Sequence, residues 1–214
     1  MSNPETLVII GLPFLIAGLV KGVIGMGLPM VSLSLLTATV GLLPAMGLLI
    51  VPSLVTNVWQ GLAGGALVSI LRRFWTFLLA VCAGTWVGVG VLANTDVALL
   101  SALLGILLCI YSVMNLMRPQ VASPGRSEPW LSPVMGAASG VLTGLTGTFV
   151  FPGIPYLQAL SLPRDVLIQT MGVVFTVSTA ALAISLSDHR LLSVELGTLS
   201  VVALLPALVG MALG

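Results

Sequence analysis

Charged residues are rare in this chain and leave long hydrophobic stretches between them. Runs without Asp, Glu, Lys or Arg occupy residues 22–71, 74–95, 97–117, 129–163, 166–187 and 196–214. Because about 20 apolar residues cross the hydrocarbon core of a bilayer as a helix, these runs predict roughly seven to nine helical segments. The composition agrees, since 58% of the residues are hydrophobic and only 6% are charged. We therefore expect an all-α, polytopic integral membrane protein.

Glycine and proline interrupt the first hydrophobic stretch. Residues 7–20 and 28–40 are each too short to cross a membrane comfortably. Between them lie Gly22, Gly25, Gly27 and Pro29. Glycine weakens a helix interior and proline removes a hydrogen bond, so the backbone should leave helical geometry here. Within a membrane such a break persists only where protein or water satisfies its polar groups, as in a solute-binding site. For Gly18 and Gly22 close helix packing is the better interpretation.

The second half of the chain repeats the pattern of the first. A polar, proline-rich loop at 118–130 separates a first transmembrane repeat (1–117) from a second (131–214). The matched pairs are Gly18 and Gly140, Gly22 and Gly144, Gly25 and Gly147, Pro29 and Pro152, Pro44 and Pro163, Arg73 and Arg190, and Gly88 and Gly210. Their shared order predicts an internal duplication. Because four residues follow Gly210, whereas a whole helix at 97–117 follows Gly88, we expect the second repeat to lack its last helix.

The arginines predict how the repeats are oriented. If 74–95 and 97–117 both cross the membrane, four arginines share one side, which the excess of basic residues makes cytoplasmic. These are Arg72, Arg73, Arg118 and Arg126. An in-line break gives each repeat an even number of crossings and parallel copies, whereas a re-entrant hairpin gives an odd number and inverted copies. We favour inverted repeats, which would place Arg190 outside.

Lys21 is the only charged residue between Glu5 and Arg72, and it directly precedes the first break. A lysine inside a membrane segment costs free energy unless it is paired, snorkels or faces water. It could complete an anion site beside the break, or it could lie near the membrane surface and snorkel. Thr143 stands at the matching place in the second half, so any contribution of charge is asymmetric.

Polar side chains on later helices are further candidates. Asn57 and Gln60 lie three residues apart on one face of a predicted helix over 45–70, with Ser53 and Thr56 nearby. Their counterparts in the second half fall in the stretches Gln169-Thr-Met-Gly172 and Thr176-Val-Ser-Thr179. Buried amides in lipid need partners, which a neighbouring helix or a solute can provide. Singly these residues fit interhelical contacts, and as a set they fit the lining of a polar cavity.

Together these features predict an anion site between the two breaks, since helix N-termini and exposed backbone amides favour negative charge. The predicted substrate-binding residues are Lys21, Gly22, Gly25, Gly27, Asn57, Gln60, Thr143, Gly144, Gly147, Thr148 and Gln169.

Several motifs resemble the TauE/SafE family of bacterial sulfite exporters. They are Gly18-Leu-Val-Lys-Gly-Val-Ile-Gly-Met-Gly27 with Pro29, Thr56-Asn-Val-Trp-Gln60, Gly144-Leu-Thr-Gly147 with Pro152, Tyr156-Leu-Gln-Ala-Leu160, Leu162-Pro163 and Leu167-Ile-Gln-Thr-Met-Gly172. The resemblance implies a duplicated helical carrier in the bacterial inner membrane. Its substrate would be a small anion, such as sulfite, an organosulfonate or another organic anion.

Other classes of function have less support. His189 is the only histidine and sits in a charged turn, and neither HExxH nor GxSxG occurs, so we expect no enzyme. No ligand cluster predicts a metal or another cofactor, and a net charge of +1 does not suit nucleic acid. An anion channel or a non-transporting membrane scaffold remains the alternative. The sequence leaves open whether H⁺ or Na⁺ is the coupling ion and whether the chain forms a homo-oligomer.

Overall fold

The computed structural model describes residues 4–117 and 123–214, so residues 118–122 of the predicted interrepeat loop, with Arg118, lie outside it. The described residues form nine α-helices, one 3-10 turn and no strand. The elements are α1 (Pro4–Ile24), α2 (Leu28–Val40), α3 (Leu42–Leu62), α4 (Leu67–Leu92), α5 (Val97–Met117), η1 (Gly125–Ser127), α6 (Glu128–Thr146), α7 (Gly153–Ala159), α8 (Arg164–Asp188) and α9 (Val194–Leu213). Five of the helices, namely α3, α4, α5, α8 and α9, are long and apolar enough to cross a membrane. The expectation of an all-α, polytopic membrane protein is confirmed.

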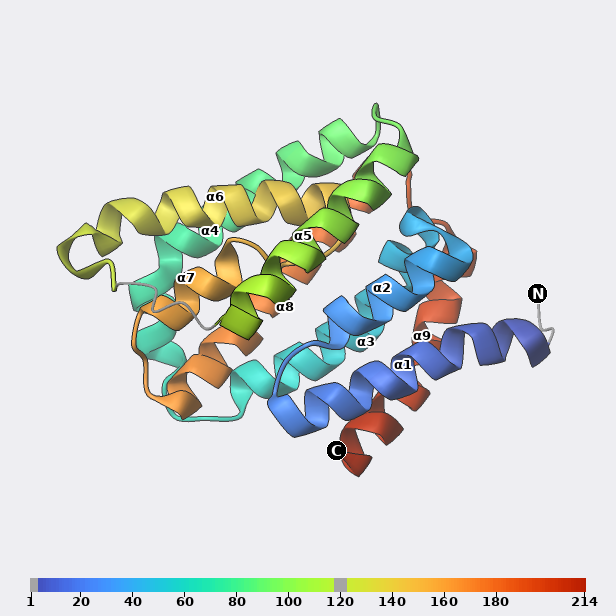
Figure 1. The fold of residues 1–214 in the computed structure, drawn as a ribbon, viewed down its shortest axis with the longest axis horizontal. Helices are drawn as coiled ribbons and strands as arrows, with labels where there is room; N and C mark the ends of the chain where they lie inside the picture. The colour runs from blue at the N-terminus through green and yellow to red at the C-terminus, as the bar shows by residue number, and fades with distance from the viewer. Residues whose placement is uncertain (1–3, 118–122) are drawn as a thin grey trace.

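The first glycine-rich break is a re-entrant hairpin. After α1 ends, Gly25 and Gly27 adopt φ values of 81° and 105°, which glycine reaches without steric cost. The 13-residue α2 then begins with Pro29 in its first turn and runs back beside α1 (Figure 1). The chain therefore reverses direction at the break instead of continuing in line.

A second break follows α6. Gly147 ends that helix with a φ of 77°, and residues 148–152 form an irregular segment before the short α7. The predicted helix over 45–70 is wrong, because α3 ends at Leu62 and α4 begins at Leu67. Gly64 reaches a φ of 144° in the turn between them, a conformation open to glycine that stops the helix.

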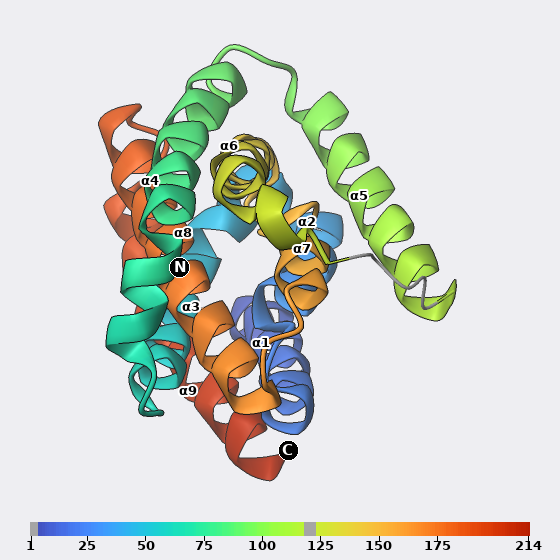
Figure 2. The same cartoon turned by 90° about the vertical axis from the view of Figure 1, so that its left-hand side faces the viewer.

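Glycines bring two pairs of helices into backbone contact, and we call these contacts the α1–α9 and α4–α6 seams. A Cβ atom on Gly18 would lie 2.2 Å from the carbonyl oxygen of Ala207, and one on Gly140 would lie 2.3 Å from that of Val81. No other residue type fits so close to a neighbouring backbone, and small residues drive such contacts in membranes. Figure 2 shows α4 and α6 lying side by side.

The two seams follow the same register. A Cβ on Gly88 would lie 2.3 Å from the carbonyl oxygen of Val141, and one on Gly214 would lie 2.3 Å from that of Leu19. Val141 directly follows Gly140, and Leu19 directly follows its counterpart Gly18, so the packing matches Gly88 with Gly214. This is one helical turn beyond Gly210, the counterpart that the sequence suggests.

At these seams, helices of the first half pack against helices of the second half. The first half supplies α1 to pack on α9 and α4 to pack on α6, while α3 and α8 meet at Gly61 and Gly172. In Figure 1, α1 runs from right to left and its proposed counterpart α6 runs from left to right. We propose on this basis that the halves are inverted repeats.

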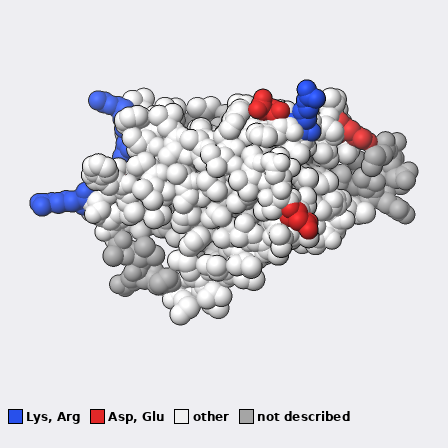
Figure 3. All heavy atoms as spheres, turned by 90° about the horizontal axis from the view of Figure 1, so that it is seen from above, with Lys and Arg blue, Asp and Glu red and all other residues white. Residues whose placement is uncertain are grey.

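Charged residues lie near both ends of α4. Near the start of α4, Arg73 makes a bidentate ion pair with Glu128, with distances of 2.7 Å and 2.8 Å. Near the other end of α4, the ring of Trp86 lies 6.3 Å from that of His189, the neighbour of Arg190. Arg73 and Arg190 thus lie toward opposite ends of the helix. Figure 3 shows basic side chains projecting from one end, acidic side chains and a further basic one on the other half of the face, and a broad uncharged surface between them.

This arrangement predicts the sidedness of two arginines. In a variant without Cys82 and Cys109, single cysteines placed by Arg72→Cys and Arg190→Cys should react with an impermeant maleimide from opposite sides of the membrane. The end of the molecule that carries Arg72, Arg73 and Arg126 is called the arginine-rich end. Position 72 should label from the cytoplasm, because an excess of basic residues marks the cytoplasmic side. Labelling of both positions from the same side would overturn the inverted arrangement.

Candidate functional site

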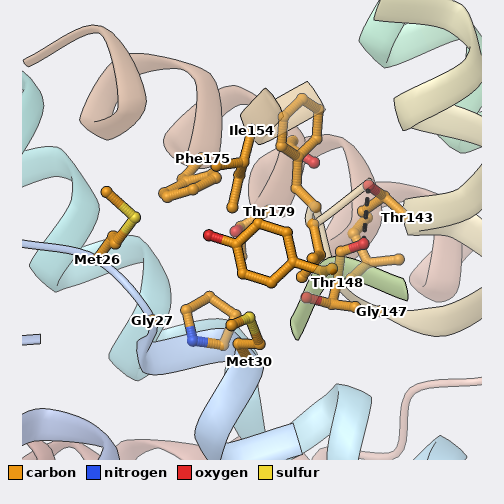
Figure 4. Close-up of a pocket in the computed structure, with 15 residues that line it drawn as sticks. Met26, Gly27, Met30, Thr143, Gly147, Thr148, Ile154, Phe175 and Thr179 are labelled. Carbon is orange, nitrogen blue, oxygen red and sulfur yellow. Dashed lines mark hydrogen bonds between the residues drawn. The ribbon is translucent and has the colours of Figure 1, made fainter. Parts of the chain in front are cut away.

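A cavity of about 40 Å³ lies between the two breaks. The first break supplies Met26, Gly27, Pro29 and Met30, the second Gly147, Thr148, Phe149, Val150 and Ile154, and the helices Tyr111, Thr143, Phe175, Ser178, Thr179 and Leu182. Figure 4 shows the labelled residues converging on this space from both breaks and from α8. The volume holds roughly three water molecules and so suits a solute of a few atoms.

The cavity wall combines hydroxyl groups with aromatic rings and thioethers, and no charged side chain lines it. The hydroxyl of Thr143 is already engaged, since it donates to the carbonyl oxygen of Ser139 over 2.7 Å. Ser178 is only 1% exposed, and its Oγ atom has no partner among the described residues. A buried hydroxyl without a partner costs free energy, so it is available to a bound solute.

Unpaired backbone amides flank the cavity on both sides. Among the described residues, the N–H groups of Thr148, Phe149 and Val150 find no acceptor, and neither do those of Met26 and Gly27. Buried amides are almost always satisfied by protein, water or ligand. Several unpaired N–H groups in irregular backbone make a concave site that favours an anion.

Lys21 lies inside the protein, one helical turn before the first break. Its side chain is 4% exposed, and Nζ donates to Thr56 Oγ1 over 3.1 Å and also to Asn57 Oδ1. Lys21 therefore does not snorkel to a surface. The amide nitrogen of Asn57 and the hydroxyl of Ser53 have no described partner. In the part of the chain that the structure describes, the only ion pair joins Arg73 and Glu128, so no carboxylate neutralises Lys21.

The two predicted glutamines connect helices. Gln60 donates to the carbonyl oxygen of Ile168 over 2.8 Å. Gln169 donates to the carbonyl oxygens of Gly61 and Gly64 and accepts from the amide of Ala66 over 3.0 Å. Gln169 thereby holds the turn between α3 and α4.

The predicted glycines fall into two groups. Gly27 and Gly147 line the cavity, as do the predicted threonines Thr143 and Thr148. By contrast, Gly22 and Gly144 belong to the seams, where a Cβ atom would lie 2.5 Å from Met211 O and 2.4 Å from Thr85 O, respectively. Gly25 shapes the hairpin and lies beside Ile168 without lining the cavity.

Sequence reasoning missed several lining residues. Ser178 and Thr179 belong to the polar stretch that the sequence matched to Asn57 and Gln60, but they were not named among the predicted binding residues. Tyr111 is a single tyrosine in the apolar α5, and only the packing of α5 over the breaks brings it to the cavity. Met26 and Phe175 have side chains that fit a hydrophobic core equally well.

The Lys21–Asn57 contact predicts a stability pattern. Asn57→Leu removes a buried acceptor from Lys21 and should lower the free energy of unfolding by about 1–3 kcal/mol. Lys21→Met combined with Asn57→Leu removes both polar partners and should recover most of that loss. Thermal unfolding in detergent micelles, with Lys21→Met alone to complete the cycle, measures the coupling. A double variant as unstable as Asn57→Leu would contradict this assignment.

Comparison with known proteins identifies the chain. Residues 10–214, essentially its whole length, match the family described as Sulfite exporter TauE/SafE. No curated protein and no solved structure gives a significant match. The match agrees with the multi-pass helical architecture and with the resemblance of the motifs. The chain belongs to the sulfite exporter TauE/SafE family, whose members are membrane transporters of sulfur-containing anions.

Proposed function

We propose that the protein is a secondary transporter that binds a small anion in the cavity between its two breaks and moves it by alternating access. Sulfite and small organosulfonates are the substrates that this site favours. The observation that carries the proposal is the set of unpaired amides at Met26, Gly27 and residues 148–150 around one cavity. An oxyanion accepts several hydrogen bonds at once and would satisfy these unpaired groups, of which those at residues 148–150 are buried.

The size and lining of the cavity support a compact substrate. Because the cavity holds only about three water molecules, a compact solute such as a sulfur atom with three oxygens suits it better than an extended molecule. Sulfonate oxygens would face the amides and the hydroxyl of Ser178, while the thioether of Met30 and the ring of Phe175 suit a methyl substituent.

Lys21 supplies the positive charge nearest to the first break. Because charges interact strongly in a low-dielectric interior, the ammonium favours an anion even without lining the cavity. The amide nitrogen of Asn57, beside Lys21, adds a second open donor. Thr143 replaces the lysine at the second break, so the charge acts from one side only.

The seams indicate which parts of the protein move together. Each joins a helix of one half to a helix of the other through backbone contact, so α1 moves with α9 and α4 moves with α6. Access would then alternate by displacement of these pairs, with the breaks as deformable segments between them. We propose that the protein lies in a bacterial inner membrane with the end that carries Arg72, Arg73 and Arg126 in the cytoplasm. Its apolar helices and the excess of basic residues at that end support this orientation.

Two serine substitutions on α8, one in the cavity and one outside it, test the proposal. Ser178→Ala removes a buried hydroxyl that has no partner among the described residues, so it should not lower thermal stability. It should raise the half-saturating sulfite concentration in liposome uptake about ten- to a hundredfold, since a lost hydrogen bond to a charged group costs about 1.5–3 kcal/mol.

Ser185→Ala is the matched control. Ser185 is also buried without a described partner on α8, but it does not line the cavity. Its uptake should equal that of the wild type. Equal half-saturation in all three proteins would exclude the cavity as the binding site, and uptake that never saturates would favour a channel.

A further inference from the structure

The hydrogen bonds of Lys21 suit a neutral amine. An ammonium group has three N–H donors, and a neutral amine has two. Lys21 Nζ donates to two acceptors, Thr56 Oγ1 and Asn57 Oδ1, and both are uncharged. The Thr56 hydroxyl can only accept from Lys21, because it donates its own hydrogen to the carbonyl oxygen of Pro52 over 2.7 Å. A third N–H would have no acceptor among the described residues.

The elements packed against α1 offer Lys21 no counter-charge. Neither α2 nor α3 contains a titratable side chain. On α9 the one such residue is Glu195, which lies 16 residues before Met211, or about 24 Å along the helix from the turn that packs against Gly22. On α8, Asp165 is exposed and forms no ion pair with Lys21.

A bound anion changes the protonation equilibrium of Lys21. When an anion occupies the cavity beside the first break, it stabilises the protonated form of Lys21 by direct Coulomb attraction. Because coupling between two bound ligands is reciprocal, a proton on Lys21 also tightens anion binding. The amide nitrogen of Asn57, whose oxygen accepts from Lys21, is buried without a described partner.

We infer that Lys21 couples transport to protons: its amine takes up one proton as the anion binds and releases it when the anion leaves on the other side. The proton adds to the nitrogen lone pair from water on the loading side and returns to water on the release side, so no other bond changes. This inference rests on the proposed function. A monovalent anion then crosses with one proton and no net charge.

A pH gradient across liposomes tests the coupling in the full-length protein. Methanesulfonate is the probe, because it is the anion of a strong acid and does not itself take up protons near neutral pH. With the membrane potential clamped at zero, an outside pH one unit below the inside should drive about tenfold accumulation, since one pH unit is equivalent to a tenfold concentration ratio. Without the gradient the concentrations should simply equalise.

Two variants separate the charge of residue 21 from its titration. Lys21→Arg keeps a permanent positive charge, so it should exchange methanesulfonate but lose the pH-driven accumulation. Asn57→Asp places a fixed carboxylate beside Lys21, which should keep the lysine protonated and also abolish accumulation. Arg72→Met, the loss of a cation at the end of the molecule, should accumulate the probe as the wild type does.

The outcomes distinguish this inference from the proposed function. Saturable wild-type uptake that ignores the pH gradient would overturn the coupling and leave the carrier assignment standing. Tenfold accumulation by Lys21→Arg would also overturn it. Absence of any saturable flux of sulfite or methanesulfonate in the wild type would defeat the proposed function itself.

Discussion

Close contact between helix backbones is the constraint on which the architecture depends. Lipid gives apolar helices little reason to associate, so packing and interhelical hydrogen bonds must hold them together. Glycines at the two seams allow carbonyl oxygens of one helix to approach the Cα atoms of the next. The seams join α1 to α9 and α4 to α6 and so tie together helices that are far apart in the chain. They leave the backbone at the two breaks free to depart from helical geometry.

The non-helical backbone at the two breaks provides the hydrogen-bond donors of the candidate site. Left-handed glycines end α1 and α6 inside the protein, and the segments that follow carry amides without described acceptors. Soluble proteins bind anions with comparable clusters of amides at loops and helix ends. Here the cluster is divided between two breaks around one cavity. Lys21 does not line the cavity and is buried against Asn57 and Thr56, where its protonated form would add charge without occupying the cavity.

Local chemistry explains which features the sequence could predict. The uncharged runs located the membrane helices, and glycine with proline located the first break, so α2 matches the predicted 28–40 and α5 matches 97–117. The turn at Gly64 was missed, because Gln169, more than 100 residues away, stabilises it. Ser178 and Tyr111 reach the cavity only through tertiary packing. The depth of Lys21 likewise depends on α3 and α9, which no local pattern encodes.

The central claim is that a small anion binds between the two breaks, and locating a bound anion tests it most directly. Selenite has the shape and charge of sulfite and carries a selenium atom that anomalous diffraction can locate. In crystals of the full chain soaked with selenite, our account predicts one anomalous peak in the cavity, within hydrogen-bond distance of backbone amides from both breaks. A peak only at the arginine-rich end of the molecule, with the cavity empty, would contradict the account.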